Sequence, residues 1–242
     1  MDIKAVLFDL GGTLEDLSST AEEQKACIDR VQKLLKRASK GFEIPREEFY
    51  DKLMDGYREY KAWTQATGKE KSPEEIWADD YLKGFPKEGW LVRAMADRLA
   101  ELWETEFYTR DVKEGAAAAL DDLRQRGYKL GLISNTTSRT VPFMLLERYG
   151  IDTCFDCVLL SSVEGVRKPR PEMFAKACSL LGAEPKQCMY VGDQAAKDIA
   201  GAAAAGYGAK VLIASKFTAS ASGPDPDYRI ADLGELIPIL EQ

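Results

Sequence analysis

The sequence predicts an α/β protein, with a doubly wound parallel sheet and an inserted block of helices. Two observations indicate this class. In the second half of the chain, short apolar runs alternate with helical patterns, which is typical of a parallel sheet covered by helices on both faces. One more apolar run lies near the N-terminus, separated from the others by a long helical stretch. We expect that run to join the same sheet, which makes the helical stretch an insertion after it.

Composition limits the function classes. The 242 residues are 45% hydrophobic and 30% charged, which is typical of a globular chain long enough for a core and an insert. The net charge is −7 and no dense basic run occurs, so neither nucleic acid nor an anionic membrane is an expected partner. The sequence shows neither a signal peptide nor an apolar run of membrane-spanning length, and we expect a cytoplasmic protein.

Cysteine and histidine usage narrows the chemistry further. The five cysteines are expected to be reduced, and Cys154 and Cys157 form the only close pair. That pair is either redox-active, half of a metal site, or two thiols at the start of a strand; the last interpretation is favoured. The chain contains no histidine, which excludes Ser-His-Asp and Cys-His catalysis and histidine metal ligands. Carboxylates, hydroxyls, lysines and a hard metal ion remain.

The first strand is predicted over residues 5–8, an apolar run that ends at Asp9. Gly11 and Gly12 then allow a sharp turn and a close approach to a ligand, and Thr13 adds a hydroxyl. A carboxylate at this place is either the end of an ordinary turn or a ligand-binding group, because open α/β sheets bind ligands at the carboxyl ends of their strands.

Residues 18–109 are predicted to form about four helices and contain all four tryptophans. A capping box at Ser19 or Thr20 begins the first helix, Pro45 precedes the second, and Ser72 caps the third. A fourth helix is predicted over 91–103. Aromatic residues repeat at helical spacing in this block; they either line a substrate pocket or form core, and core is favoured.

From residue 111 onward strands and helices alternate, so the predicted sheet domain comprises 1–17 and 110–242 and the helical cap 18–109. Residues 215–227 are Ser-, Gly- and Pro-rich and are predicted to be a loop. The predicted strands are 129–133, 157–160, 188–191 and 210–214, and the predicted helices are 113–126, 141–149, 170–181, 198–205 and 233–240.

Three of these strands end in polar groups, namely Asp9, Ser134 with Asn135, and Asp193. We expect them to converge, because the carboxyl ends of parallel strands share one edge of the sheet. Lys168 precedes one helix and Asp198 begins another. Such a set suits phosphoryl transfer, since a carboxylate can attack phosphorus and Mg²⁺ prefers oxygen ligands. Each residue alone has an ordinary alternative, as a helix cap, a surface lysine or a turn.

In their order and strand context these residues resemble the four motifs of the haloacid dehalogenase superfamily. The motifs are Asp9 with Thr13, Ser134 with Asn135, Lys168 in Lys-Pro-x-Pro, and Gly192-Asp193-x₄-Asp198. The helical block stands where members of the dehalogenase and phosphoglycolate-phosphatase type carry a helical cap. The resemblance therefore implies a Rossmann-like core, a Mg²⁺ cofactor and a small phosphorylated metabolite as substrate.

The resemblance also implies a role for each motif residue. Asp9 would be the nucleophile and a metal ligand, and the backbone carbonyl of Gly11 a further ligand. Asp193 would bind the metal, with Asp198 as another ligand or a residue that holds the others in place. Thr13 is placed in the substrate-binding set by the first motif. Three residues would act on the phosphoryl group, by binding its oxygens or neutralising its charge: Ser134, Asn135 and Lys168.

One departure from the family pattern matters. Gly11 stands where phosphatases of the family carry the aspartate that protonates the leaving group. General acid–base catalysis is worth roughly 10²–10⁴-fold. Water or a nearby residue such as Glu15 could replace it, or the enzyme could favour acyl and aryl phosphates. The alternative is a catalytically weakened protein that binds a phosphoryl ligand or a protein partner.

Other chemistries of the family fit less well. A dehalogenase-type hydrolase is a lesser alternative, because dehalogenases need no metal and commonly lack the Gly-Asp that is present at residues 192–193. Phosphomutases depend on the missing acid. A phosphonate hydrolase would need a cap lysine that forms a Schiff base, and nothing in the sequence distinguishes Lys25, Lys52 and Lys61. The oligomeric state and the substrate itself have no signature in the sequence.

Overall fold

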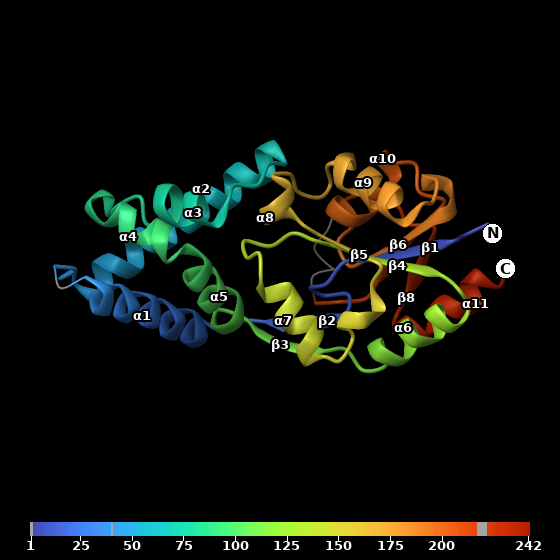
Figure 1. Ribbon diagram of the computed structural model, residues 1–242, viewed down its shortest axis with the longest axis horizontal. Coiled ribbons are helices and arrows are strands. Elements are labelled where there is room, and N and C mark those ends of the chain that lie inside the picture. Colours follow the sequence, from blue (N-terminus) through green and yellow to red (C-terminus); the bar gives the residue numbers. More distant parts are fainter. Residues whose placement is uncertain (1, 40, 217–221) are drawn as a thin grey trace.

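The computed structural model describes residues 2–39, 41–216 and 222–242. It has a sheet-containing part, where both termini lie, and a helical part at the opposite end (Figure 1). Six parallel strands pair in the order β5-β4-β1-β6-β7-β8, with β1 near the centre. The predicted fold class, a parallel sheet with covering helices, is confirmed. The strands are β1 (Ala5–Phe8), β4 (Lys129–Ser134), β5 (Cys157–Leu160), β6 (Cys188–Gly192), β7 (Ala209–Ile213) and β8 (Tyr228–Ile230).

Alternation along β1 explains why helices cover both faces. Val6 and Phe8 point into one apolar cluster, and Ala5 and Leu7 point into another on the opposite face. A strand buried on both sides must be apolar throughout, as β1 is. Figure 1 shows α9 and α10 on one side of the sheet and α6 and α11 on the other. The helices of this part are α6 (Ala116–Gln125), α7 (Val141–Arg148), α8 (Ser161–Glu164), α9 (Pro171–Leu181), α10 (Ala200–Ala204) and α11 (Leu236–Leu240).

The helical part has its own apolar core, rich in aromatic side chains such as Trp77 and Trp103. The prediction of a single helix over 91–103 is wrong in one respect, because the helix is interrupted at Met95, which separates two helices. The π-helical segment η1 (Ile76–Tyr81) continues directly from α3. The α-helices are α1 (Ala21–Ala38), α2 (Arg46–Thr67), α3 (Pro73–Glu75), α4 (Gly89–Ala94) and α5 (Ala96–Glu106).

A two-stranded antiparallel sheet joins the two parts. It pairs β2 (Glu15–Ser18) with β3 (Thr109–Val112). The sequence did not predict it, because both strands are short and mostly polar. The predicted domain boundaries at residues 17 and 110 fall inside this sheet, and the division into core and cap stays a prediction.

Other differences lie near the carboxyl end of the chain. The helix predicted over 198–205 starts earlier, as the π-helical segment η5 (Ala195–Ile199), so Asp198 lies within its first turn. The edge strand β8 was not predicted. The helix predicted over 233–240 starts with one 3₁₀ turn, η7 (Leu233–Glu235). Within the predicted loop 215–227, residues 217–221 lie outside the described residues.

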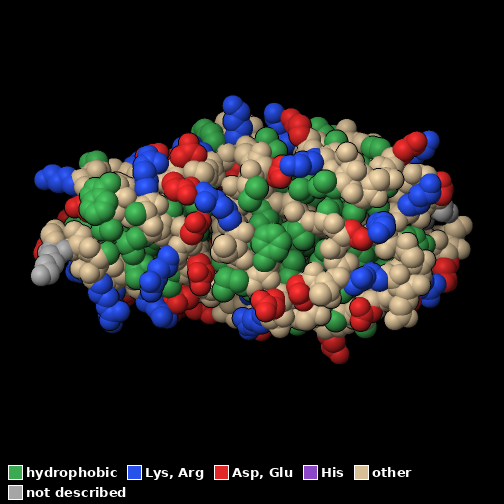
Figure 2. Space-filling model, in the orientation of Figure 1, with side chains coloured by type: hydrophobic (Ala, Val, Ile, Leu, Met, Phe, Trp, Pro, Cys, Tyr) green, Lys and Arg blue, Asp and Glu red, His purple; other side chains and the backbone are tan. Residues whose placement is uncertain are grey.

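All five cysteines are buried free thiols, and Cys157 begins β5 as predicted. Acidic and basic side chains are interspersed over the face drawn in Figure 2. Among the described helices, none is long and apolar enough to cross a membrane.

Candidate functional site

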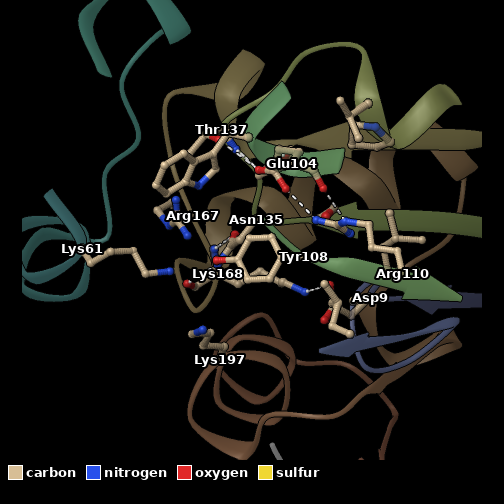
Figure 3. A pocket seen from close by; sticks show the side chains of 18 of the residues that line it. Asp9, Lys61, Glu104, Tyr108, Arg110, Asn135, Thr137, Arg167, Lys168 and Lys197 are labelled. Atoms are coloured by element: carbon tan, nitrogen blue, oxygen red, sulfur yellow. Dashed lines mark hydrogen bonds and ion pairs between the residues drawn. The ribbon is translucent and has the colours of Figure 1, made fainter. Parts of the chain in front are cut away.

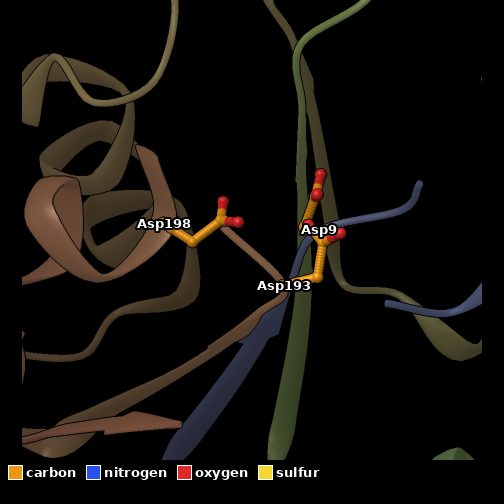
Figure 4. Close-up of side chains that lie close together, drawn as sticks. All are labelled: Asp9, Asp193 and Asp198. Atoms are coloured by element: carbon orange, nitrogen blue, oxygen red, sulfur yellow. The ribbon is translucent and has the colours of Figure 1, made fainter. Parts of the chain in front are cut away.

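Three carboxylates converge at the carboxyl edge of the sheet. Asp9 follows β1, Asp193 follows β6, and Asp198 comes from η5. All three are buried, and one oxygen from each lies within 4.8 Å of the others. Figure 4 shows Asp198 pointing toward Asp9 and Asp193. The expected convergence of these side chains is therefore present in the structure.

Lys168 lies between two of these carboxylates. Its Nζ is 2.7 Å from Asp9 Oδ1 and 2.7 Å from Asp198 Oδ1, and it donates to Tyr190 Oη at 3.0 Å. Asn135 fixes the backbone of the same residue, since its Nδ2 donates to the Lys168 carbonyl at 3.1 Å and its Oδ1 accepts from the Lys168 N–H at 2.9 Å. Tyr190 was missed by the sequence analysis because its place within β6 carries no motif.

The charges at this cluster do not balance. Burial raises the pKa of Asp9 to about 7, against the opposing charge of Lys168 and with the help of Asp198 and Asp193. Burial alone would lower the pKa of Lys168. The charges of Asp198 and Asp9 outweigh burial and raise this pKa above its usual value, so the lysine stays protonated. Asp193 Oδ1 is buried and has no hydrogen-bond partner. Three carboxylates with one ammonium and one orphaned oxygen fit a divalent cation that prefers oxygen ligands.

The glycine turn is shaped by these carboxylates. Gly12 has φ +86°, and a Cβ there would overlap the carboxylate of Asp193. Residue 12 must therefore be glycine both for its backbone conformation and for its closeness to Asp193. At Gly11, a Cβ would overlap Cδ1 of Leu17 and lie 3.7 Å from Glu15 Oε1. Leu17 thus fills the space that a side chain at position 11 would enter.

A cavity of about 290 Å³ opens over this edge of the sheet. Asp9, Gly11, Ser134 and Asn135 line it together with Lys168 and Asp198. The other two residues of the predicted site do not line it: Asp193 is fully buried, and Thr13 is fully buried with a hydroxyl that lacks a hydrogen-bond partner.

Aromatic residues of the helical part form another wall of the cavity. Tyr57, Tyr81, Trp103 and Tyr108 line it, and Tyr57 Oη lies 3.3 Å from Tyr108 Oη. The aromatic residues thus serve in both of the ways that were considered, as core and as lining. Of Lys25, Lys52 and Lys61, only Lys61 lines the cavity, and it lies across the pocket from Asp9 in Figure 3.

Two buried glutamates of the helical part bind residues of the sheet part and so hold the two parts together. Glu104 of α5 accepts from Thr136 Oγ1 at 3.1 Å and from Thr137 N and Oγ1 at 3.1 and 2.9 Å. Glu70 accepts from Ser161 Oγ at 2.7 Å and pairs with Arg167. Removing one member of a buried ion pair costs about 3–5 kcal/mol, so we expect these contacts to stabilise the packing of the two parts beside the cavity.

Glu15 lies near Gly11 but is not free to transfer a proton. Its carboxylate is 0% exposed, pairs with Arg110 and accepts from Tyr149 Oη at 2.7 Å. Arg110 also pairs with Glu104 at 2.6 Å, so Glu15 belongs to the network that links the two parts. Burial raises the pKa of Glu15 against the opposing effect of Arg110.

Comparison with known proteins agrees with this geometry. A family model described as haloacid dehalogenase-like hydrolase matches residues 3–206, which includes every residue of the cluster. The chain belongs to the haloacid dehalogenase-like hydrolases. The predicted resemblance is therefore confirmed.

Two named relatives span nearly the whole chain. A glyceraldehyde 3-phosphate phosphatase of Methanopyrus kandleri is 30% identical over 99% of this chain and 98% of its own length. A ribulose-1,5-bisphosphate 5-phosphatase of Halopiger xanaduensis is 28% identical over 96% of this chain and 97% of its own. The crystal structure of a phosphatase of the family from Thermococcus onnurineus superposes with a TM-score of 0.65, with 24% identity and 98% of both chains covered.

Proposed function

We propose that this family member is a Mg²⁺-dependent phosphohydrolase that removes phosphate from a small phosphorylated metabolite through an aspartyl phosphate on Asp9. The observation that carries the proposal is the placement of Lys168, 2.7 Å from both Asp9 and Asp198, beside Asp193 and at the floor of the cavity. The two relatives described above, which are phosphatases of small phosphorylated compounds, support the same reaction class.

In the proposed reaction, an oxygen of Asp9 attacks phosphorus and the bond from phosphorus to the leaving-group oxygen breaks. Lys168 stabilises the charge on the phosphoryl group, and Ser134 with the backbone N–H of Asn135, two residues that line the cavity, are the proposed donors to its oxygens. Water then attacks phosphorus, which releases phosphate and regenerates the Asp9 carboxylate.

Asp9, Asp193 and Asp198, with the Gly11 carbonyl, are the proposed ligands of Mg²⁺, as the sequence suggested. The ion would supply positive charge for the phosphoryl oxygens and keep Asp9 ionised. The carboxylate cluster supports phosphoryl transfer over dehalogenation, because three converging carboxylates would repel an anionic substrate unless a cation were bound.

The leaving group must depart without a protein acid at position 11. Glu15 is enclosed by Arg110 and Tyr149, so it does not supply one in this arrangement. We therefore propose a preference for aryl or acyl phosphates, whose leaving groups need no proton. The second candidate, a weakened member that binds a phosphoryl ligand or a protein, is favoured by the same observation, because no free carboxyl group stands near position 11 among the described residues.

Metal dependence tests the proposal. Hydrolysis of p-nitrophenyl phosphate by the native chain should stop on addition of a chelator and return with excess Mg²⁺. Asp193→Asn should require a higher Mg²⁺ concentration for half-maximal activity, because the buried Oδ1 without a hydrogen-bond partner is the proposed ligand atom. Equal turnover in chelator would refute the proposal. Absence of turnover with Mg²⁺-dependent binding of phosphate would favour the second candidate.

A further inference from the structure

Three cationic side chains line the cavity at a distance from the nucleophile. Lys61 comes from α2, Arg167 from the segment between α8 and α9, and Lys197 from η5. In Figure 3 they lie on one side of the pocket, and Asp9 lies on the other side of Lys168. Lys61 and Arg167 thus lie away from Asp9, whose oxygen would attack phosphorus, and Lys197 lies next to Asp198 in η5.

The cavity cations differ in their partners. Lys168 pairs with Asp9 and Asp198, and Arg110 pairs with Glu15 and Glu104. Within the described ranges, by contrast, Lys61 has no carboxylate oxygen within 4 Å, and the same holds for Lys197. The far end of the cavity therefore carries a surplus of positive charge.

Arg167 is held in place beside these two lysines. Its backbone N–H donates to the Gly68 carbonyl at 2.9 Å, and its Nη1 pairs with the buried carboxylate of Glu70. An arginine has five N–H donors, so this pairing leaves others for a ligand. Burial, together with the charges of Arg167 and Lys197, lowers the pKa of Lys61 to about 8. Like charges held together in a cavity are stabilised when an anion binds among them.

We propose that Lys61, Arg167 and Lys197 form a second anion-binding site, which selects phosphorylated substrates whose leaving group carries a further carboxylate or phosphoryl group. The inference rests on the proposed phosphohydrolase function and narrows its substrate class. In the proposed function, Lys168 and the cation held by the carboxylates bind the phosphoryl group itself. The second site contacts the part of the substrate that leaves.

A matched pair of substrates tests the inference. In 4-carboxyphenyl phosphate the leaving group bears a carboxylate, and in 4-carbamoylphenyl phosphate a neutral amide of similar size replaces it. The native chain should prefer the carboxylate in kcat/KM by about tenfold or more, the usual contribution of a charge-assisted hydrogen bond. A third substrate, 4-phosphonophenyl phosphate, shows whether the site favours a phosphoryl-type anion over a carboxylate.

Variants of Lys61 show whether this residue causes the preference for the carboxylate substrate. Lys61→Gln should reduce the preference for carboxylate over amide to near unity while hydrolysis of the amide substrate continues. Lys61→Arg should retain the preference, because it keeps the charge but cannot form an imine. Lys52→Gln is the matched control, since Lys52 lies on the same helix, pairs with Glu48 and does not line the cavity.

The outcomes separate this inference from the proposed function. Turnover of both substrates at equal kcat/KM by the native chain overturns the second site and leaves the phosphohydrolase intact. An equal loss on both substrates in Lys61→Gln also overturns it, because Lys61 would then act on the phosphoryl group. If neither substrate is hydrolysed, calorimetric binding of 4-carboxybenzylphosphonate and its amide with Mg²⁺ decides: tighter binding of the carboxylate supports the site, and equal binding refutes it.

Discussion

Replacing Asp9 by asparagine is expected to lower kcat for p-nitrophenyl phosphate by roughly 10³-fold or more, because the amide cannot form the acyl phosphate. The fold should survive the change. Asp9 is one of three crowded carboxylates, and burial with Asp198 and Asp193 already disfavours its charge. Lys168 keeps Asp198 as its partner in the variant. The melting temperature of Asp9→Asn should therefore not fall with its activity.

Asp16→Asn is the matched control for this prediction. Asp16 lies in the same segment, but its side chain is 61% exposed and its nearest cation, Lys113, is 4.0 Å away. Its replacement should leave kcat within about twofold. Comparable losses in the two variants would mean that the segment, and not the Asp9 carboxylate, is what the reaction requires.

Restoring a carboxylate at position 11 is expected to broaden the range of leaving groups. Gly11→Asp together with Leu17→Ala should raise the hydrolysis of alkyl phosphates by roughly 10²–10⁴-fold, the usual contribution of a general acid. Leu17→Ala is included because Leu17 Cδ1, the end of a flexible side chain, would otherwise have to move to make room for the new Cβ. Aryl phosphates should gain little, because their leaving groups depart without a proton. The measurement is kcat/KM on an alkyl and an aryl phosphate for each variant.

Two control variants show whether the gain comes from the new carboxyl group. Leu17→Ala alone enlarges the cavity without adding an acid and should give no gain. Gly11→Asn with Leu17→Ala has the same shape as the gain variant and cannot donate a carboxyl proton. If the native chain already hydrolyses alkyl and aryl phosphates at similar rates, another group supplies the proton and the significance assigned to Gly11 is wrong.

Local sequence patterns were sufficient to predict five of the six strands of the parallel sheet, all except the edge strand β8. The apolar run of β1 and the polar residues that follow it are neighbours in the chain, so the polar residues necessarily lie at the carboxyl end of the strand. The same holds for β4 with Ser134 and for β6 with Asp193. Because parallel strands share one carboxyl edge, the meeting of these residues followed from topology.

The remaining features depend on contacts between distant segments. β2 and β3 are short and mostly polar, and each is stabilised by pairing with the other across the whole helical insertion. Nothing in the sequence distinguishes Lys61 from other lysines of α2, and only the folded structure shows that it lines the cavity. The partners of Glu15 lie far away in sequence, at Arg110 and Tyr149, so its enclosure could not be foreseen.

The most direct test of the account is to trap the phosphoryl group on the protein. The native chain is mixed with excess p-nitrophenyl phosphate and Mg²⁺, quenched in acid within milliseconds to seconds, digested and analysed by mass spectrometry, with Asp9→Asn treated in parallel. We expect one acid-stable, hydroxylamine-sensitive phosphoryl group on the peptide that contains Asp9, and none in the variant. A phosphoryl group on another residue, or steady turnover with an unmodified Asp9 peptide at every time point, would contradict it.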